Sequence, residues 1–471
     1  MPVLNDIKPV GAVRRVRSLG GWLLVMAFAL VVGIAFAALG EATSPLVIVA
    51  LPIGAFWLTV VLARPVWGPA AFFLAMPFAL QRVSAGSFQV IDLVAIVAVG
   101  AVVLARTVRP SEGRLPFPWI LTWGVALCVL ATLSLTSALD RTLATDQLIV
   151  LLASFLLACA VVAVCERMED VRILVAVFLV VGCVMSVAAF TTTTSVTNFG
   201  TVVQTRSVGF FQDPNELGSL AAMLLIVALG VTLSGLPRWY RLLGGAAAVL
   251  ATSALALSLS RGAWLGTFGG LLALTILIPR AWRILAAVAA VGLVLGLTLG
   301  AFNADPTTVQ VLSSRFGQLL HPIGDPYDQR PEIWREAERE IAARPWLGYG
   351  PNNFAVASAR SGSEALTVGA VHAHDVLLTV GAEIGLPAVG ALIAFTLALA
   401  WAAWRTRRAL RGSRDAAMVA GLAAALFAFL VHGIVDYTLR SEVLLGLLWV
   451  LAALVVACDR ITRGQPASVT E

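Results

Sequence analysis

Three arginines and one histidine stand out in this sequence because their side chains suit chemistry on an anionic group. Arg206, Arg261 and Arg330 lie in segments that join apolar runs, and His374 directly precedes another apolar run. A guanidinium is always charged and forms paired hydrogen bonds to phosphate oxygens. An imidazole can take up or release a proton near neutral pH. The arginines are therefore suited to bind a phosphate-bearing group, and the histidine is a candidate for proton transfer.

Each of these residues also has a structural alternative. An arginine at a membrane surface can reach lipid headgroups or pair with an acid such as Asp213. A lone histidine often serves only as a hydrogen-bonded structural residue. His372 makes a metal-binding pair with His374 conceivable, but no third ligand at suitable spacing is apparent, so no metal is expected. The functional prediction depends on the arginines and His374 acting together.

The composition is that of a protein embedded in lipid. Hydrophobic residues make up 59% of the 471 residues and charged residues 12%, with a mean hydropathy of +0.93. So few charges cannot cover a water-exposed surface. Apolar runs long enough to cross a hydrocarbon core of roughly 30 Å recur along the chain. We predict an all-α polytopic membrane protein with 12–14 transmembrane helices, at residues 19–39, 45–62, 66–80, 91–104, 118–139, 148–164, 171–190, 217–233, 242–259, 263–278, 284–302, 376–404, 416–435 and 443–456. The pair 45–62 and 66–80 could instead form a re-entrant hairpin, which would leave twelve.

Basic residues indicate the orientation of these helices. They cluster in alternate connections, around residues 106–114, 238–241, 280–283, 405–414 and 460–463. Connections rich in arginine and lysine usually stay in the cytoplasm. The pattern predicts an inner (cytoplasmic) membrane protein with cytoplasmic N- and C-termini. The short clusters at helix ends, despite a pI near 9.5, do not indicate a nucleic-acid partner.

Two connections on the opposite, periplasmic or extracellular side are longer and carry the candidate residues. They cover residues 191–216 and 303–375. Long connections with structure of their own usually carry function. Within the second, residues 331–341 form an amphipathic helix pattern that starts with Pro331 and suits a membrane interface.

Other charged residues are given structural roles. The glutamates of the amphipathic helix alternate with arginines and are expected to form a solvated face. They are Glu332, Glu336, Glu338 and Glu340. His432, Asp436 and Arg440 recur at helical spacing and are expected to anchor a helix end.

The order of motifs from about residue 206 to residue 436 resembles the O-antigen ligase-related family of bacterial polysaccharide ligases and polymerases. The motifs are Arg206-Ser207-Val208-Gly209 with Pro214-Asn215, Ser260-Arg261-Gly262, Arg330-Pro331-Glu332-Ile333-Trp334, Leu347-Gly348-Tyr349-Gly350, His374-Asp375-Val376 and Glu383-Ile384-Gly385-Leu386-Pro387. The family commonly has His-Asn where this chain has His374-Asp375. The neighbouring carboxylate leaves the charge state of His374 open.

The resemblance implies an integral-membrane inverting glycosyltransferase of cell-surface polysaccharide biosynthesis. Its donor would be an undecaprenyl-diphosphate-linked glycan and its acceptor a glycan, lipid or protein, with no metal ion or other cofactor. By the same resemblance, Arg206, Arg261 and Arg330 would bind the diphosphate, and His374 would be the catalytic residue that orients or deprotonates the acceptor hydroxyl. Ligase and polymerase remain alternatives.

The expected organisation has three parts. Residues 1–190 form N-terminal transmembrane helices, residues 191–436 form the ligase- or polymerase-like core with the outer loop 303–375, and residues 437–471 form the last transmembrane helix and a cytoplasmic tail. Two other functions are considered. A secondary transporter of amphiphilic solutes should have ionisable residues or broken helices near the bilayer midplane. A non-catalytic envelope-assembly protein would need no convergent arginines and histidine.

Overall fold

The computed structural model describes residues 45–78, 89–108, 118–198, 202–283, 330–362 and 372–464. Within these residues, eight helices are long and apolar enough to cross a membrane, which confirms the all-α polytopic fold. They are α4 (Val90–Val108), α6 (Arg141–Val164), α7 (Met168–Ala188), α8 (Pro214–Thr232), α9 (Arg238–Ser258), α16 (Leu386–Ala409), α17 (Ala416–Gly433) and α18 (Glu442–Gly464). The predicted spans at 19–39 and 284–302 lie outside the described residues.

Four further predicted spans correspond to one helix of 19 residues and to three shorter helices, each with a 3-10 turn at or just after its end. These are α2 (Pro45–Ala63), α3 (Trp67–Ala75) with η1 (Met76–Phe78), α5 (Leu121–Ser134) with η2 (Leu135–Ser137), and α10 (Arg261–Leu277) followed by η3 (Pro279–Ala281). Together α3 and η1 cover Trp67–Phe78, roughly 18 Å at a rise of about 1.5 Å per residue, and the residues that follow, 79–88, lie outside the described part of the chain. The re-entrant alternative for this segment therefore stays a prediction.

The predicted continuous span at 376–404 is wrong, because the chain breaks at Gly385. Residues before the break form α15 (Val376–Ile384), and α16 follows directly. Gly385 has a φ of 101°, which a residue with a Cβ rarely adopts, and Pro387 suits the first turn of the next helix. A helix break in apolar surroundings ends α15 early and separates it from the transmembrane helix.

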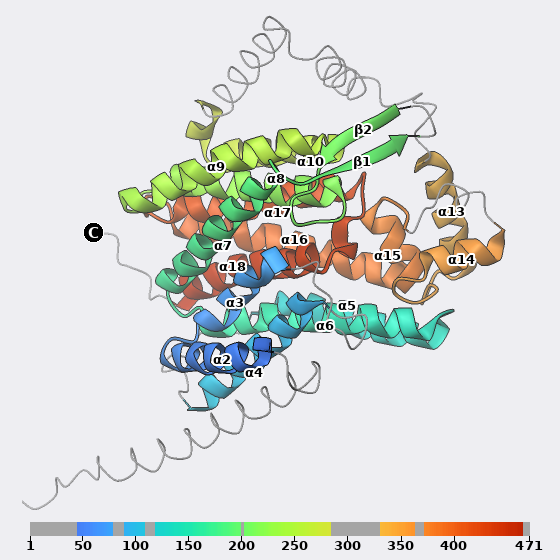
Figure 1. The fold of residues 1–471 in the computed structure, drawn as a ribbon, viewed down its shortest axis with the longest axis horizontal. Helices are drawn as coiled ribbons and strands as arrows, with labels where there is room; N and C mark the ends of the chain where they lie inside the picture. Colours follow the sequence, from blue (N-terminus) through green and yellow to red (C-terminus); the bar gives the residue numbers. More distant parts are fainter. Residues whose placement is uncertain are drawn as a thin grey trace, which may run out of the picture.

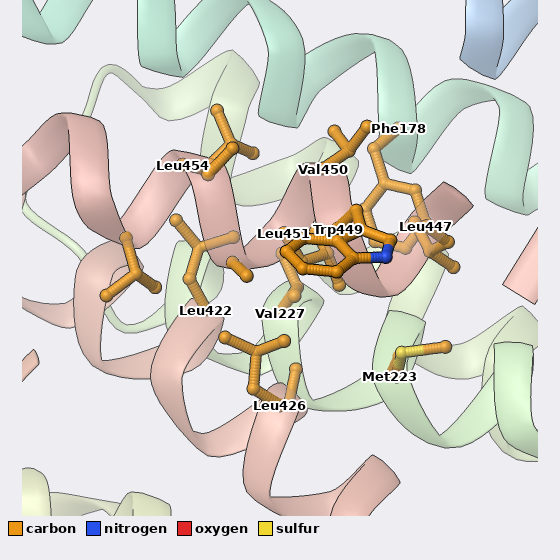
Figure 2. Packing of buried hydrophobic residues seen from close by; sticks show 14 of the residues in the cluster. Phe178, Met223, Val227, Leu422, Leu426, Leu447, Trp449, Val450, Leu451 and Leu454 are labelled. Atoms are coloured by element: carbon orange, nitrogen blue, oxygen red, sulfur yellow. The ribbon is translucent and has the colours of Figure 1, made fainter. Parts of the chain in front are cut away.

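The core of the bundle lies around α8 and α18, whose apolar windows are each 89% buried. Figure 2 shows Trp449, Val450 and Leu451 of α18 packed among side chains of α7, α8 and α17. Helices that are apolar on all sides, as these are, must be covered by protein or lipid on every face. The buried helices form a rigid frame from which the connections at each end extend.

The connections with secondary structure of their own gather at one end of the bundle, here called the loop end (Figure 1). They comprise the antiparallel hairpin β1 (Thr193–Asn198) and β2 (Val202–Ser207), α13 (Arg330–Ala343), α14 (Phe354–Ser361) and α15. The hairpin was not predicted. The opposite end, here called the arginine end, holds buried ion pairs between helix termini, Arg172 with Asp415 and Arg405 with Asp459.

Helix α13 confirms the predicted amphipathic helix, but its surroundings differ from those expected. Its apolar stripe, including Ile333 and Ala337, packs against Phe354, Ala373 and Ala382 of the protein. The prediction that this stripe lies on a membrane interface is therefore wrong. A hydrophobic stripe shows that a helix is covered on one side, but it does not show by what.

The predicted solvated face of α13 is also only partly correct. Glu332 and Glu338 are exposed, whereas Glu336 and Glu340 are 3% and 4% exposed. The two buried carboxylates point toward α14, where Ser361 and Ser358 donate hydrogen bonds to them at 2.7 Å. Packing of α14 against α13 thus buries two glutamates of the charged face of α13 and gives them hydrogen-bond partners.

Candidate active site

His374 lies at the turn that begins α15. Asp375 caps this helix by accepting a hydrogen bond from the backbone N–H of Leu378 at 2.8 Å. His374 itself has a φ of 52°, in the left-handed region that costs a residue with a side chain free energy. Strained backbone of this kind persists where the surrounding structure holds it, often at functional sites. The cap and the strained turn together fix the direction of the imidazole.

Asp436 is the partner of this imidazole. His374 Nδ1 lies 2.8 Å from Asp436 Oδ1, across 62 positions of sequence. The side chain of Asp436 is 6% exposed and that of His374 is 29% exposed. The interpretation of Asp436 as a helix-end anchor is therefore incomplete, since α17 ends at Gly433 and the carboxylate points to the histidine.

The charge of Asp436 defines which ring nitrogen of His374 carries the proton. Burial alone would raise the pKa of Asp436, but the imidazoles of His372 and His374 facing it hold the pKa well below its usual range. An ionised carboxylate only accepts hydrogen bonds, so Nδ1 of His374 must donate. In the neutral ring, Nε2 then holds the lone pair. The pair can therefore remove a proton from a hydroxyl that approaches Nε2.

His372 lies beside this pair and is more deeply buried. Its Nε2 is 3.8 Å from Asp436 Oδ1, its Nδ1 has no partner among the described residues, and burial lowers its pKa. The ligand atoms of His372, His374 and Asp436 lie within 4.8 Å of one another, so they could hold a metal ion. Asp436 is the third candidate ligand that the sequence spacing did not reveal.

Arg206 lies one residue before the end of β2, and its side chain reaches the C-terminal end of α9. Its Nε donates to the carbonyl oxygen of Ser258 at 2.8 Å, and its Nη2 donates to Asn215 Oδ1 at 3.0 Å. The residue is 8% exposed. The motif that joins Arg206 to Pro214-Asn215 in the sequence is thus one hydrogen-bonded unit at the loop end.

Arg261 is the first residue of α10. Ser260 caps the helix by accepting from the backbone N–H of Ala263 at 3.3 Å. Gly262 faces His432 so closely that a Cβ would lie 2.6 Å from its ring. The serine and glycine of this motif therefore let the positive N-terminal end of α10, with Arg261, approach His432.

Arg330 begins α13 and interacts electrostatically with His432. The backbone carbonyl oxygen of His432 accepts a hydrogen bond from the backbone N–H of Asp436 at 3.0 Å. The Nδ1 atom of its ring is hydrogen-bonded to the hydroxyl of Ser219 at 2.7 Å. His432 thus lies next to Gly262 of the Arg261 motif, interacts electrostatically with Arg330, and bonds through its backbone to Asp436, the partner of His374. The structure brings all the predicted site residues to the loop end.

The remaining motifs hold this arrangement in place. The backbone N–H groups of Tyr349 and Gly350 donate to the carbonyl oxygens of Ala382 and Glu383 at 3.0 and 2.8 Å. The carboxylate of Glu383 accepts from the backbone N–H groups of Asn352 and Phe354. These bonds tie the segment after α13 to the end of α15. They fix the position of His374 at the other end of that short helix.

Arg440 adds a cation that was expected only to anchor a helix end. It lies in η5 (Thr438–Arg440), and its guanidinium pairs with Asp213 at 3.0 Å and with Glu216 at 3.4 Å. Asp213 is also the N-cap of α8, accepting from Asn215 N at 2.7 Å. This ion pair joins the segment of Arg206 to the segment of Asp436.

Fold and site together define a polytopic membrane protein with a histidine–carboxylate pair and several arginines at one end of the bundle. Residues 246–393 match the O-antigen ligase family model. This segment, less than half of the chain, is similar to O-antigen ligases, and the similarity supports a role of polysaccharide ligase or polymerase type. The matched residues include Arg261, Arg330 and His374, whereas Arg206 and Asp436 lie outside them.

Comparison with curated proteins gave no match. Among solved structures, a chain from a study of the structural coordination of polymerization and crosslinking by a peptidoglycan synthase complex is similar at 19% identity. The likeness covers 73% of this chain and 96% of that chain, with a TM-score of 0.42. At this level it supports no conclusion about function.

Proposed function

We propose that the protein transfers a glycan from an undecaprenyl-diphosphate-linked donor to an acceptor at the outer face of the cytoplasmic membrane. The observation that carries the proposal is the 2.8 Å contact between His374 Nδ1 and Asp436 Oδ1, in a chain with a segment similar to O-antigen ligases. The contact leaves Nε2 of a neutral His374 available to an acceptor hydroxyl.

In the proposed step, the acceptor oxygen forms a bond to the anomeric carbon of the donor sugar. The bond between that carbon and the diphosphate oxygen breaks on the opposite face, so the configuration inverts. His374 Nε2 takes the proton of the acceptor hydroxyl, and Asp436 stabilises the imidazolium that forms. Undecaprenyl diphosphate leaves with the bond electrons.

Arg206, Arg261 and Arg330 are assigned to the diphosphate. All lie at the loop end, and guanidinium groups stabilise the charge that grows on a leaving diphosphate. The N-terminus of α10 adds positive potential beside Arg261. Positive charge around the leaving group lowers the barrier because it interacts more strongly with the transition state than with the bound donor.

The charge distribution supports the proposed orientation. Several arginines gather at the arginine end, including Arg172, Arg405, Arg460 and Arg463, and the positive-inside tendency places such an end in the cytoplasm. A reporter fused near Gly350 at the loop end should then report an extracytoplasmic location. Cytoplasmic labelling at Gly350 would contradict the site assignment.

The activity is tested by deletion and reconstitution. A strain lacking the gene should accumulate glycan linked to undecaprenyl diphosphate, and the purified protein in liposomes should transfer that glycan and release undecaprenyl diphosphate. The structure of the product would distinguish a polymerase, which extends the glycan, from a ligase, which joins it to another acceptor. Absence of both accumulation and transfer would refute the proposal.

A further inference from the structure

A polar cavity of about 550 Å³ opens between α13 and α14 at the loop end. Its walls include Glu336, Glu340, Arg335, Arg339 and Ser361. The volume is within the range of roughly 300–1,000 Å³ found for small-molecule sites, but such sites are usually lined by apolar side chains. A cavity with a polar lining is instead suited to a ligand with many hydroxyl groups.

Two carboxyl groups that line this cavity accept hydrogen bonds from serine hydroxyls of α14. Glu340 Oε1 accepts from Ser358, while Glu340 Oε2 is buried without a partner among the described residues. Burial raises the pKa of Glu340 to about 8, so its carboxyl group is largely protonated at neutral pH and can donate as well as accept. Glu336 accepts from Ser361 at 2.7 Å and from Arg339 at 3.4 Å.

The charges of the cavity do not favour an ionic ligand. Arg335 and Arg339 are offset by Glu332 and Glu336, so neither a metal ion nor a phosphate gains from the net charge. The ion pair between Arg335 and Glu332 is about half exposed on both sides, so it contributes little and can be exchanged for ligand contacts. Alternating donors and acceptors fit the neighbouring hydroxyls of a neutral sugar.

Helix α13 connects the cavity to the proposed active site. Its first residue, Arg330, interacts with His432, and its stripe at Ile333 and Ala337 packs with Ala373, the residue between the two site histidines. At a rise of about 1.5 Å per residue, Glu336 and Glu340 lie roughly 9 and 15 Å along the axis from Arg330. A glycan whose reacting sugar is at His374 could therefore extend along α13 into this cavity.

We infer that the cavity between α13 and α14 is a subsite for a sugar unit of the glycan, one or more units away from the reacting sugar. This inference depends on the proposed function. The sugar belongs either to the donor glycan or to a glycan acceptor, because the chemistry of the subsite is the same for both. Binding there holds the chain in register without contacting the reacting atoms.

The test uses the full-length protein in detergent and the oligosaccharide released by mild acid from the lipid-linked glycan that a deletion strain accumulates. Calorimetry measures binding of this oligosaccharide to the wild type and to the variants Arg339→Ala and Glu336→Gln. Transfer assays give KM for the donor and the acceptor separately. Arg360→Ala and Glu338→Gln are matched controls, because both residues are exposed on the same helices away from the cavity.

Each cavity variant should weaken oligosaccharide binding about tenfold or more and raise one of the two KM values similarly, with kcat retained. The substrate whose KM rises identifies the source of the sugar. The control variants should match the wild type. Wild-type affinity and KM in both cavity variants would overturn the inference, as would failure of the wild type to bind the oligosaccharide.

The His374→Ala variant separates this inference from the proposed function. It should bind the oligosaccharide normally while transfer is lost, because the cavity does not use the histidine. Normal transfer by His374→Ala would contradict the proposed catalytic role but would leave the binding results of the cavity variants as an independent test.

Discussion

The buried Asp436 at the loop end has partners of a different kind from those of the buried acids at the arginine end. At the arginine end, Arg172 forms two hydrogen bonds with Asp415 at 2.7 and 2.6 Å, and Arg405 does the same with Asp459 at 2.8 and 2.7 Å. At the loop end, the buried carboxylate of Asp436 faces imidazoles instead. A guanidinium keeps its proton throughout the physiological pH range, whereas an imidazole exchanges one.

This difference indicates which end is built for stability and which for chemistry. Paired guanidinium–carboxylate bonds hold helix ends together at any ordinary pH. A carboxylate paired with an imidazole can stabilise a proton that arrives during a reaction. The described residues other than glycine with positive φ also lie at the loop end, namely Leu259, Asn352 and His374. Strained backbone conformations and the titratable His374–Asp436 pair thus occur at the same end of the bundle.

The largest effect on transfer is expected from breaking the histidine–carboxylate pair. His374→Ala removes the proposed base, and Asp436→Asn removes the charge that stabilises its protonated form, so each should lower kcat by about 10²- to 10⁴-fold. His372→Ala should do much less, because its ring is buried and lies 3.8 Å from the carboxylate. Reconstituted transfer, normalised to folded protein, measures these effects. Full activity of His374→Ala would remove the histidine from the mechanism.

A smaller loss is expected when the arginines at the loop end become lysines. Arg206 uses two different nitrogens to reach Ser258 and Asn215, which a single ammonium cannot reproduce. Arg206→Lys and Arg330→Lys should each lower transfer roughly 10- to 100-fold while membrane abundance is retained. Arg360→Lys, at an exposed position of α14, is the control. Near-normal transfer in both site variants would remove Arg206 and Arg330 from the proposed diphosphate site.

At the arginine end, the same kind of change should affect stability rather than chemistry. Arg172→Met leaves the buried Asp415 without its guanidinium, at a cost of about 3–5 kcal/mol in the free energy of unfolding. Arg64→Met breaks the exposed pair with Glu169 and should cost at most about 1 kcal/mol. Thermal unfolding in detergent compares the two. A loss of turnover per folded molecule in Arg172→Met would contradict the prediction that the arginine end affects only stability.

The smallest effect on transfer is expected from metal removal. Asp436 Oδ1 already accepts the hydrogen bond of His374, so a metal ion at these atoms would replace the pair that the proposed step uses. Transfer should therefore be unchanged after treatment of the purified protein with EDTA. A loss of activity restored by one divalent cation would show that His372, His374 and Asp436 act as metal ligands.

The sequence was sufficient to predict the all-α membrane fold and to propose candidate site residues, but not to predict how these residues meet. Apolar runs and arginine clusters predict spans because each depends on local composition. The contact of His374 with Asp436 joins residues 62 positions apart, and no periodic pattern connects them. The spacing of His432 and Asp436, one helical turn, instead suggested that both lie on one helix. In the structure, α17 ends between them at Gly433.

The outer helix shows the same limit. Its stripe at Ile333 and Ala337 predicted an amphipathic helix correctly, yet protein rather than a membrane surface covers the stripe. Glu336 and Glu340 lie one helical turn apart and face α14, whereas Glu338 lies on the other side of α13 and is exposed. The sequence does not show that α14 covers the first of these two faces. The break at Gly385 was missed because apolar residues continue on both sides of it.

The pH dependence of transfer tests the central claim most directly. The pKa of Asp436 is held well below its usual range, so this carboxylate stays ionised across the neutral and mildly acidic range. If His374 Nε2 is the base, the rate at saturating substrates should fall as the pH is lowered and the imidazole becomes protonated. A rate that instead rises as the pH is lowered would show that His374 acts as a cation, and would contradict the account.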